Sequence, residues 1–255
     1  MSAAMNLNPL PGAKQAYVGT MRLARPVAQW LGLLSRLNSV AADKRWAHFL
    51  RSLFAIHDID GLIELDVPWW TYSAIDEIEA FLHTHPQARV FEYGSGASTV
   101  WLSKRAGEVK SVEHDKSWHA LVSERLSRAN PGKNSNYTLI EADTAVPGTD
   151  PVYLSEKSGY AGLSFETYAR AILHEDGLFD VIVIDGRARG ACLRHAVQKL
   201  SADGIIVFDN SKRQRYQEAM GTCGLQAQIF RGLTPSLPYS EETTILKRLP
   251  GHLKE

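Results

Sequence analysis

Hydrophobic residues recur at helical spacing in two stretches near the start of the chain, at residues 19–40 and at residues 46–54. A stripe with this period predicts an amphipathic helix whose apolar face packs on another surface. Residues 1–18 lack the period, so we expect a loose leader there. The pattern predicts a leader and helical cap over residues 1–64. This cap either packs on the main domain or serves as a substrate lid or dimer contact.

From residue 65 onward, short β-rich runs alternate with helical patterns. Strands are expected at residues 89–93, 109–113, 137–141, 180–185 and 204–209. Helices are expected at residues 73–83, 98–105, 117–129, 190–200 and 212–223. This alternation is typical of a doubly wound sheet, so we predict an α/β domain over residues 65–255. Two final runs, at 225–230 and 243–249, have no helix-length segment between them and predict a closing antiparallel hairpin.

Two aromatic-rich segments outside the strands are candidates for covering a site. Residues 144–174 form a connection longer than a sheet usually needs, and we expect an active-site cover there with a short helix at 164–173. Trp69, Trp70 and Tyr72 precede the first helix of the α/β domain. They either cover a cofactor or stack on a substrate, and plain core packing is the alternative.

Composition limits the classes of partner. The 255 residues include 28 Lys plus Arg and 28 Asp plus Glu, so no global field draws the chain to nucleic acid or membrane, although a local basic patch is left open. No run approaches the ~20 apolar residues of a membrane span, and none resembles a signal peptide. Cys192 and Cys223 make no disulfide framework. We expect a cytoplasmic protein with a small-molecule partner, either monomeric or homodimeric.

The strongest chemical signal follows the first predicted strand, where the sequence reads Val-Phe-Glu-Tyr-Gly-Ser-Gly-Ala-Ser-Thr. Gly94 and Gly96 permit a tight turn and let a ligand touch bare backbone, and the next helix presents free amide groups. A dinucleotide fingerprint has a third glycine where this chain has Thr99. Glu92, two residues before the first glycine, disfavours a pyrophosphate. It favours a ligand with ammonium and sulfonium groups, such as S-adenosylmethionine.

Acidic residues also stand at the ends of the next two predicted strands. Glu113 ends the second strand, where a carboxylate can accept hydrogen bonds from both hydroxyls of a ribose. Glu141, Ala142 and Asp143 end the third strand, where Asp143 is placed to meet an adenine amine. Acids at three successive strand ends, beginning with Glu-x-Gly-x-Gly, favour a nucleoside ligand over three solvated strand caps.

With these motifs, residues 65–249 resemble the class I S-adenosylmethionine-dependent methyltransferases, above all uncharacterised bacterial members whose first motif reads Phe-Glu-Tyr-Gly-Ser-Gly-x-Ser-Thr. The resemblance implies a Rossmann-like, mostly parallel seven-stranded sheet of order 3-2-1-4-5-7-6 with strand 7 antiparallel. It implies that Glu113 binds the ribose and Asp143 the adenine amine, with His114 and Ala142 beside the adenine ring. It implies that the methionine portion is held by Glu92, Gly94, Gly96 and Ser98.

The fourth and fifth strand ends carry the candidate catalytic residues Asp185, Arg187 and Asp209. Because the pocket of such a sheet opens at the carboxyl ends of its strands, we expect Asp185, Asp209 and Asn210 to converge there. Asp185, Asp209 and Asn210 offer oxygen ligands for Mg²⁺ or another divalent cation, which would lower the pKa of an acceptor hydroxyl. This set is similar to that of the catechol and caffeoyl-coenzyme A O-methyltransferases, which have a lysine where this chain has Ala188. Without a metal, Asp185 would bind cofactor or substrate.

Three function classes are open at this point. The first is methyl transfer from S-adenosylmethionine to the oxygen of a small-molecule or sugar-type acceptor. That acceptor is acidic if the basic residues near the catalytic edge form a rim, namely Arg187, Arg189, Lys212, Arg213 and Arg215. The second is a nicotinamide-dependent oxidoreductase, and the third is a non-catalytic protein that binds the cofactor. No Asn/Asp-Pro-Pro-Tyr/Phe motif follows the fourth strand, which disfavours methylation of the amino groups of nucleic-acid bases or glutamine.

Overall fold

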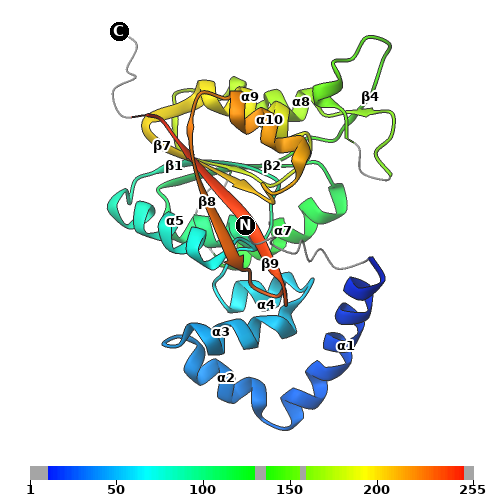
Figure 1. Ribbon diagram of the computed structural model, residues 1–255, viewed down its shortest axis with the longest axis vertical. Helices are drawn as coiled ribbons and strands as arrows, with labels where there is room; N and C mark the ends of the chain where they lie inside the picture. The colour runs from blue at the N-terminus through cyan, green and yellow to red at the C-terminus, as the bar shows by residue number, and fades with distance from the viewer. Residues whose placement is uncertain (1–10, 130–135, 156–158, 250–255) are drawn as a thin grey trace, which may run out of the picture.

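The computed structural model describes residues 11–129, 136–155 and 159–249, and within these ranges seven strands form one sheet of order β3-β2-β1-β6-β7-β9-β8 (Figure 1). The strands are β1 (Arg89–Tyr93), β2 (Glu108–Glu113), β3 (Asn136–Leu139), β6 (Phe179–Ile184), β7 (Leu200–Asp209), β8 (Gln226–Leu233) and β9 (Ser240–Lys247). β9 runs antiparallel to both neighbours, and the other pairs are parallel. The predicted order 3-2-1-4-5-7-6 with an antiparallel seventh strand is confirmed.

Helices cover both faces of the sheet because alternate residues of the central strands are apolar on both sides. In β6, Val181 and Val183 join one buried cluster and Ile182 and Ile184 join the other. The first cluster is covered by α4 (Ile59–Glu64), α5 (Tyr72–Thr84), α6 (Ala97–Arg105) and α7 (Lys116–Ala129). The second is covered by α8 (Glu166–Arg170), η3 (Ala171–His174), α9 (Arg189–Lys199) and α10 (Gln214–Thr222).

The segment before α4 forms a helical arm that extends below the sheet (Figure 1). It consists of α1 (Pro11–Trp30), α2 (Leu33–Ala41), α3 (Arg45–Ser52) and the short η1 (Leu53–Ala55). The prediction of one helix over residues 19–40 is wrong, because Gly32 adopts φ +70° and separates α1 from α2. The prediction of a loose leader over residues 1–18 is also wrong in part, because α1 already begins at Pro11. Residues 1–10 lie outside the described ranges.

Other boundaries differ from the sequence expectations in small ways. α5 begins at Tyr72, one residue before the expected start at 73, and Thr71 occupies its N-cap position. The connection between β3 and β6 contains the two-stranded β4 (Asp143–Thr144) and β5 (Leu163–Ser164), and η2 (Pro151–Tyr153). Its expected helix at 164–173 is divided into α8 and η3. No helix among the described residues combines the length and apolar character needed to cross a membrane.

Candidate functional site

The turn between β1 and α6 contains two glycines, and their steric surroundings differ. Gly94 adopts φ +86°, and a Cβ there would lie 2.7 Å from the backbone of Gly186 at the end of β6. Gly186 in turn leaves room for the hydroxyl of Tyr168, which a Cβ would overlap at 1.9 Å. A Cβ on Gly96 would meet only the Ser98 hydroxyl, at 4.0 Å. Gly94 therefore permits close packing of two strand ends, whereas Gly96 leaves open space beside the first turn of α6.

The Glu92 carboxylate is fully buried behind this turn. It accepts hydrogen bonds from the hydroxyls of Ser98 (2.6 Å), Thr99 (2.6 Å) and Ser111 (2.7 Å). Burial raises the pKa of Glu92 to about 7, although the three hydroxyl donors partly offset it. The Thr99 hydroxyl also accepts the Gly96 N–H (2.9 Å). Glu92 thus ties the turn to α6 and β2 from within, and the sequence-based picture of an acid facing the ligand does not describe this geometry.

The Glu113 carboxylate at the tip of β2 is held by backbone donors, by the Ser95 hydroxyl and by the His114 ring, whose Nδ1 lies 2.7 Å from Oε1. One oxygen accepts the N–H groups of His114 (2.7 Å) and Asp115 (2.9 Å), and the other accepts the N–H and hydroxyl of Ser95 (3.0 Å each). Burial alone would raise the pKa of Glu113, but the hydrogen bonds from His114, Asp115 and Ser95 outweigh it and lower the pKa below its usual range. Glu113 is therefore a fixed anion that links the tips of β1 and β2.

The predicted adenine-side residues lie near the tip of β2 and in the connection after β3. His114 packs its ring against Tyr160 (5.5 Å between centroids) and places Nε2 3.2 Å from the Tyr160 hydroxyl. Arg187 stacks over the same Tyr160 ring, at 5.2 Å. Ala142 is half-buried, whereas Asp143 lies exposed in β4 and accepts the Thr167 hydroxyl (2.8 Å). Arg187, which the sequence predicts to be catalytic, therefore points toward residues 144–174, the predicted active-site cover.

The guanidinium of Arg189 occupies the space between the tips of β6 and β7. Its Nη2 donates to Asp185 Oδ1 (2.6 Å), to the Asp185 carbonyl (2.8 Å) and toward Asn210 Oδ1 (3.4 Å). Nε donates to the Gly186 carbonyl (3.2 Å), and Nη1 donates to the Asp209 carbonyl. The side chain is only 7% exposed, so the expectation that Arg189 belongs to a basic rim is wrong.

These contacts do not fit the predicted Mg²⁺ site. A fixed cation, the Arg189 guanidinium, already bonds oxygen atoms of Asp185, Asp209 and Asn210, and a divalent ion beside it would be repelled. Within the described ranges, no cluster of three or more His, Cys, Asp or Glu side chains is arranged to hold a metal ion. The residues at these two strand tips therefore do not fit a divalent metal ion.

Asp209 differs from Asp185 in lacking a side-chain contact with the guanidinium. Its carboxylate is 4% exposed and accepts the Thr243 hydroxyl (3.1 Å). Burial, together with the nearby negative charge of Asp185, raises the pKa of Asp209 to about 8. Since Arg189 bonds the Asp185 carboxylate directly and not that of Asp209, burial disfavours the charged form more strongly at Asp209.

Two cavities meet at the carboxyl edge of the sheet and share His57, Trp69 and Asp185. The first, of about 150 Å³, lies against the first turn of α6. Its lining residues are His57, Asp58, Ile59, Leu62, Trp69, Ser95, Gly96, Ala97, Ser98, Trp118 and Asp185. The second, of about 250 Å³, lies over β7. Its lining residues are His57, Trp69, Asp185, Asp209, Asn210, Arg213, Thr234, Leu237, Tyr239 and Glu241. Asp185 therefore stands at the junction of two adjoining compartments.

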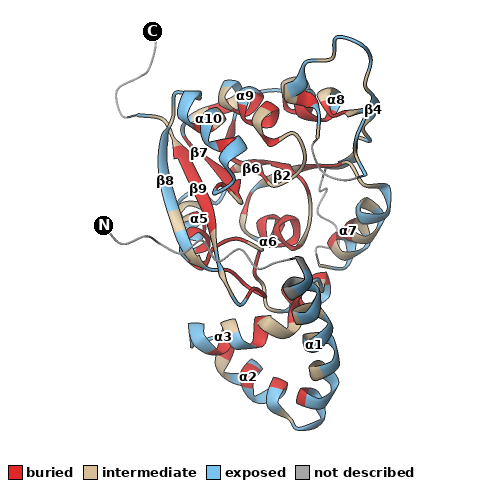
Figure 2. Ribbon diagram, turned by 45° about the vertical axis from the view of Figure 1, so that its right-hand side comes forward, coloured by how far each residue is buried: buried red, intermediate tan, exposed pale blue. Residues whose placement is uncertain are grey.

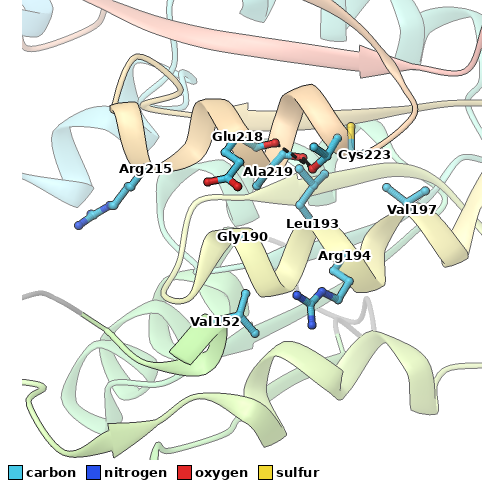
Figure 3. Close-up of a pocket in the computed structure, with 10 residues that line it drawn as sticks. Val152, Gly190, Leu193, Arg194, Val197, Arg215, Glu218, Ala219 and Cys223 are labelled. Carbon is cyan, nitrogen blue, oxygen red and sulfur yellow. Dashed lines mark hydrogen bonds between the residues drawn. The ribbon is translucent and has the colours of Figure 1, made fainter. Parts of the chain in front are cut away.

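A larger hollow of about 540 Å³ lies between α9 and α10 (Figure 3). Figure 3 shows Leu193, Arg194 and Val197 of α9 on one side of it and Glu218 and Ala219 of α10 on the other. This groove belongs to the helical layer over one face of the sheet. None of the acids at the strand tips lines it. The tips of β1, β2, β6 and β7 are therefore the better candidate site.

Several residues of this site were missed by sequence reasoning. His57 enters from the connection between η1 and α4, so the N-terminal segment supplies part of the wall. Trp118 lines the same cavity and donates its indole N–H to the Ser95 carbonyl (2.8 Å). Neither residue belongs to a motif. The hydroxyl pair Ser98 and Thr99, six and seven residues after Glu92, was the one signal in the sequence for the burial of that acid.

Comparisons with known proteins support the fold. No family model and no curated protein matches the chain. Among solved structures, the O-methyltransferase from Bacillus cereus in complex with SAH is 15% identical, with 90% of this chain and 100% of that chain covered and a TM-score of 0.52. Cofactor-bound Rv0187 from MTB is 17% identical, with 76% and 88% covered and a TM-score of 0.53. The chain therefore has the Rossmann-like fold of this class of methyltransferase.

Proposed function

We propose that this protein is an S-adenosylmethionine-dependent methyltransferase that methylates a hydroxyl of a small, sugar-type acceptor. The observation that carries the proposal is the pair of adjoining cavities that meet at Asp185, one against the glycine turn and one over β7. A methyl transfer needs two such compartments, because donor and acceptor must be aligned on opposite sides of the transferred carbon. The fold shared with an O-methyltransferase bound to SAH supports the same reaction class.

The cofactor compartment has the features that the cofactor requires. Gly96 leaves open space at the start of α6, where the free amides of the first turn favour a carboxylate such as that of methionine. Glu113 does not itself line this cavity, but it is a buried anion bonded to Ser95, which does, and its carboxylate is the proposed acceptor for the ribose diol. Asp185 lines the cavity and offers a negative charge near a sulfonium. When bound, S-adenosylmethionine supplies the electrophilic methyl group.

The other residues that the sequence predicts to bind the cofactor have different roles in this proposal. Gly94 acts by allowing the turn to approach Gly186, and Glu92 acts by holding the turn through hydroxyl groups, so neither needs to touch the ligand. His114 and Ala142 remain candidates for flanking the adenine ring. Asp143 remains the candidate for its amine, and its exposed position in β4 leaves its carboxylate accessible.

The acceptor compartment combines aromatic surface with polar atoms that lack partners. Trp69 and Tyr239 line it, as aromatic rings commonly do where a sugar ring stacks. The Trp69 indole N–H and the Thr234 hydroxyl are buried and have no hydrogen-bond partner among the described residues. A polyhydroxylated acceptor would satisfy both groups, whereas a hydrocarbon would leave them unpaired. Arg213, on the same wall, suits an acceptor that also carries an acidic group.

Asp209 is the proposed general base. Its carboxylate lines the acceptor compartment and is not neutralised by a direct contact with Arg189. With S-adenosylmethionine bound, Asp209 would accept the proton of the acceptor hydroxyl as that oxygen takes the methyl group and the cofactor is left as a neutral thioether. Arg189 holds Asp185 and the Asp209 backbone in place during this step.

The experiment is a pair of measurements on the full chain. Calorimetric titration with S-adenosylhomocysteine is expected to give one binding site per chain, and titration with NAD⁺ or NADP⁺ to give none. Labelled methyl transfer to a panel of sugars and sugar acids is then expected to proceed with chelator present. Binding of the nicotinamide cofactor alone would favour the oxidoreductase, and binding of S-adenosylhomocysteine without transfer to any acceptor would favour the non-catalytic alternative.

A further inference from the structure

The helical arm, residues 11–52, exposes an unusual set of apolar side chains. Leu23, Val27 and Trp30 form a stripe along α1 and are 77%, 56% and 84% exposed. Leu31 and Leu33, on either side of Gly32, are 60% and 42% exposed. Trp30 and Leu23 are the two most exposed large apolar side chains in the described part of the chain. Exposed apolar surface of this kind marks an interaction site.

The arm also carries a strong positive charge. Seven Lys and Arg and one Asp lie in residues 11–52, which gives a formal charge of +6 in a chain whose total is zero. Arg22, Arg36 and Lys44 are exposed and form no ion pair with any described residue. The arm therefore combines uncovered tryptophan and leucine side chains with uncompensated cations, on a protein whose remaining residues carry a net charge of −6.

The arm is attached to the rest of the protein by side-chain contacts. These contacts leave its apolar stripe exposed. Arg25 pairs with Asp58, and the Tyr17 hydroxyl lies 3.3 Å from the Ser236 carbonyl. Figure 1 shows the turn between α1 and α2 at the lower end of the molecule, away from the sheet. Figure 2 shows that α1 is mostly exposed or half-buried along its described length. The elbow, residues 29–36, therefore forms an accessible tip.

We propose that this elbow docks on the surface of a bilayer that contains anionic phospholipid. Trp30, Leu31 and Leu33 enter the boundary between headgroups and acyl chains, and Arg22 and Arg36 contact the phosphates. Basic amphipathic helices with aromatic and leucine side chains bind membranes in this way, and anionic headgroups attract nearby Lys and Arg. The helices are not membrane spans. This inference does not depend on the proposed methyl transfer.

A second copy of the chain is the competing occupant, and the charge argues against it. Most homodimers are two-fold symmetric, so a dimer built on the elbow would place the same surface of both subunits together. Arg22 and Arg36 of both copies would then lie in one interface, and the repulsion among these four cations would oppose the apolar contact. An anionic bilayer complements both features of the surface at once.

The test is co-flotation of the full-length protein with vesicles of phosphatidylcholine alone or with about 30 mol % phosphatidylglycerol. The wild type is expected to float with the anionic vesicles and to be released by high salt. Trp30→Ser combined with Leu31→Ser should lower the partition coefficient about tenfold, because the inserting side chains are lost. Arg22→Gln combined with Arg36→Gln should weaken binding to anionic vesicles by a similar factor, and the exposed positions make both pairs compatible with folding.

Ile229→Ser is the matched control, since Ile229 is 50% exposed on β8, outside the arm, and its loss should leave the partition coefficient unchanged. Wild-type protein that stays unbound, or elbow variants that float as well as the wild type, would overturn the proposal. Sedimentation that reveals a dimer dissolved by the Trp30 and Leu31 substitutions, without vesicle binding, would reassign the surface to contact between copies.

Discussion

The two halves of the site hold the acids at their strand tips in different ways. At the tips of β1 and β2, Glu92 and Glu113 are surrounded by hydroxyl and backbone N–H donors. At the tips of β6 and β7, Asp185 and the adjoining backbone carbonyls are held by the buried Arg189 guanidinium. Neutral donors can hold a carboxyl group in either protonation state, whereas a buried cation requires a partner charge. The cofactor half should therefore tolerate a neutral substitution of a buried acid, whereas the acceptor half should not tolerate the loss of its buried cation.

The largest expected effect follows from removing the cation. Arg189→Met leaves the Asp185 carboxylate and several carbonyls without their donor, and we expect a loss of ~3–5 kcal/mol in the free energy of unfolding. Chemical denaturation at pH 7 measures it. Arg213→Met is the control, because among the described residues that exposed side chain donates to Asn210 alone, and its loss should cost less than ~1 kcal/mol. Equal costs for the two variants would show that the acceptor half does not depend on its buried cation.

The next effect concerns Asp209 and is measured as a rate. Because the pKa of Asp209 is raised to about 8, kcat/KM of the wild type should increase with pH and level off above that value. Asp209→Asn should lower kcat/KM by ~10²-fold or more and abolish this rise, with little change in S-adenosylhomocysteine affinity. A variant that keeps both the rate and the pH dependence would remove Asp209 as the base.

In the cofactor half, the pH dependence of stability is the most sensitive test. Burial raises the pKa of Glu92 from 4.5 to about 7, so the folded protein holds more protons than the unfolded chain between these values. The free energy of unfolding must then fall as pH rises through this range. Glu92→Gln, which resembles the protonated acid, should remove ~2 kcal/mol of that fall between pH 5 and pH 8. Identical slopes in the two proteins would mean that Glu92 is ionised throughout.

The smallest predicted effect is on cofactor affinity. Glu113→Ala should weaken S-adenosylhomocysteine binding by at least ~1 kcal/mol, because a charged hydrogen-bond acceptor for the ribose is lost. Calorimetric titration measures the change, and Glu141→Ala, at an exposed position after β3, is the control. Unchanged affinity in the Glu113 variant would take this residue out of the cofactor site.

The sequence predicted the architecture well because the relevant signals are local. β-rich runs alternate with helical ones, and the final pair lacks a helix between its strands, so strand order and the antiparallel β9 were confirmed. Errors arose where one residue outweighed a periodic pattern. The apolar stripe runs on through residues 19–40, yet the left-handed backbone of Gly32 divides the helix.

The site was harder to predict because the direction of a side chain depends on distant neighbours. The sequence predicts that Glu92 faces a ligand, but hydroxyl groups from α6 and β2 hold it inside. The sequence predicts that Arg189 is a surface cation, but acceptors at the ends of two strands bind it in the interior. His57 reaches the site from the segment that precedes the α/β domain, and no spacing rule connects it to the motifs.

The most direct test of the account is a crystal structure of the protein soaked with S-adenosylhomocysteine. We predict that the ribose hydroxyls bond to Glu113, that the methionine carboxylate lies at the first turn of α6, and that the sulfur lies beside Asp185 facing the compartment over β7. Density for the ligand in the groove between α9 and α10, or no ligand at saturating concentration, would contradict the central claim.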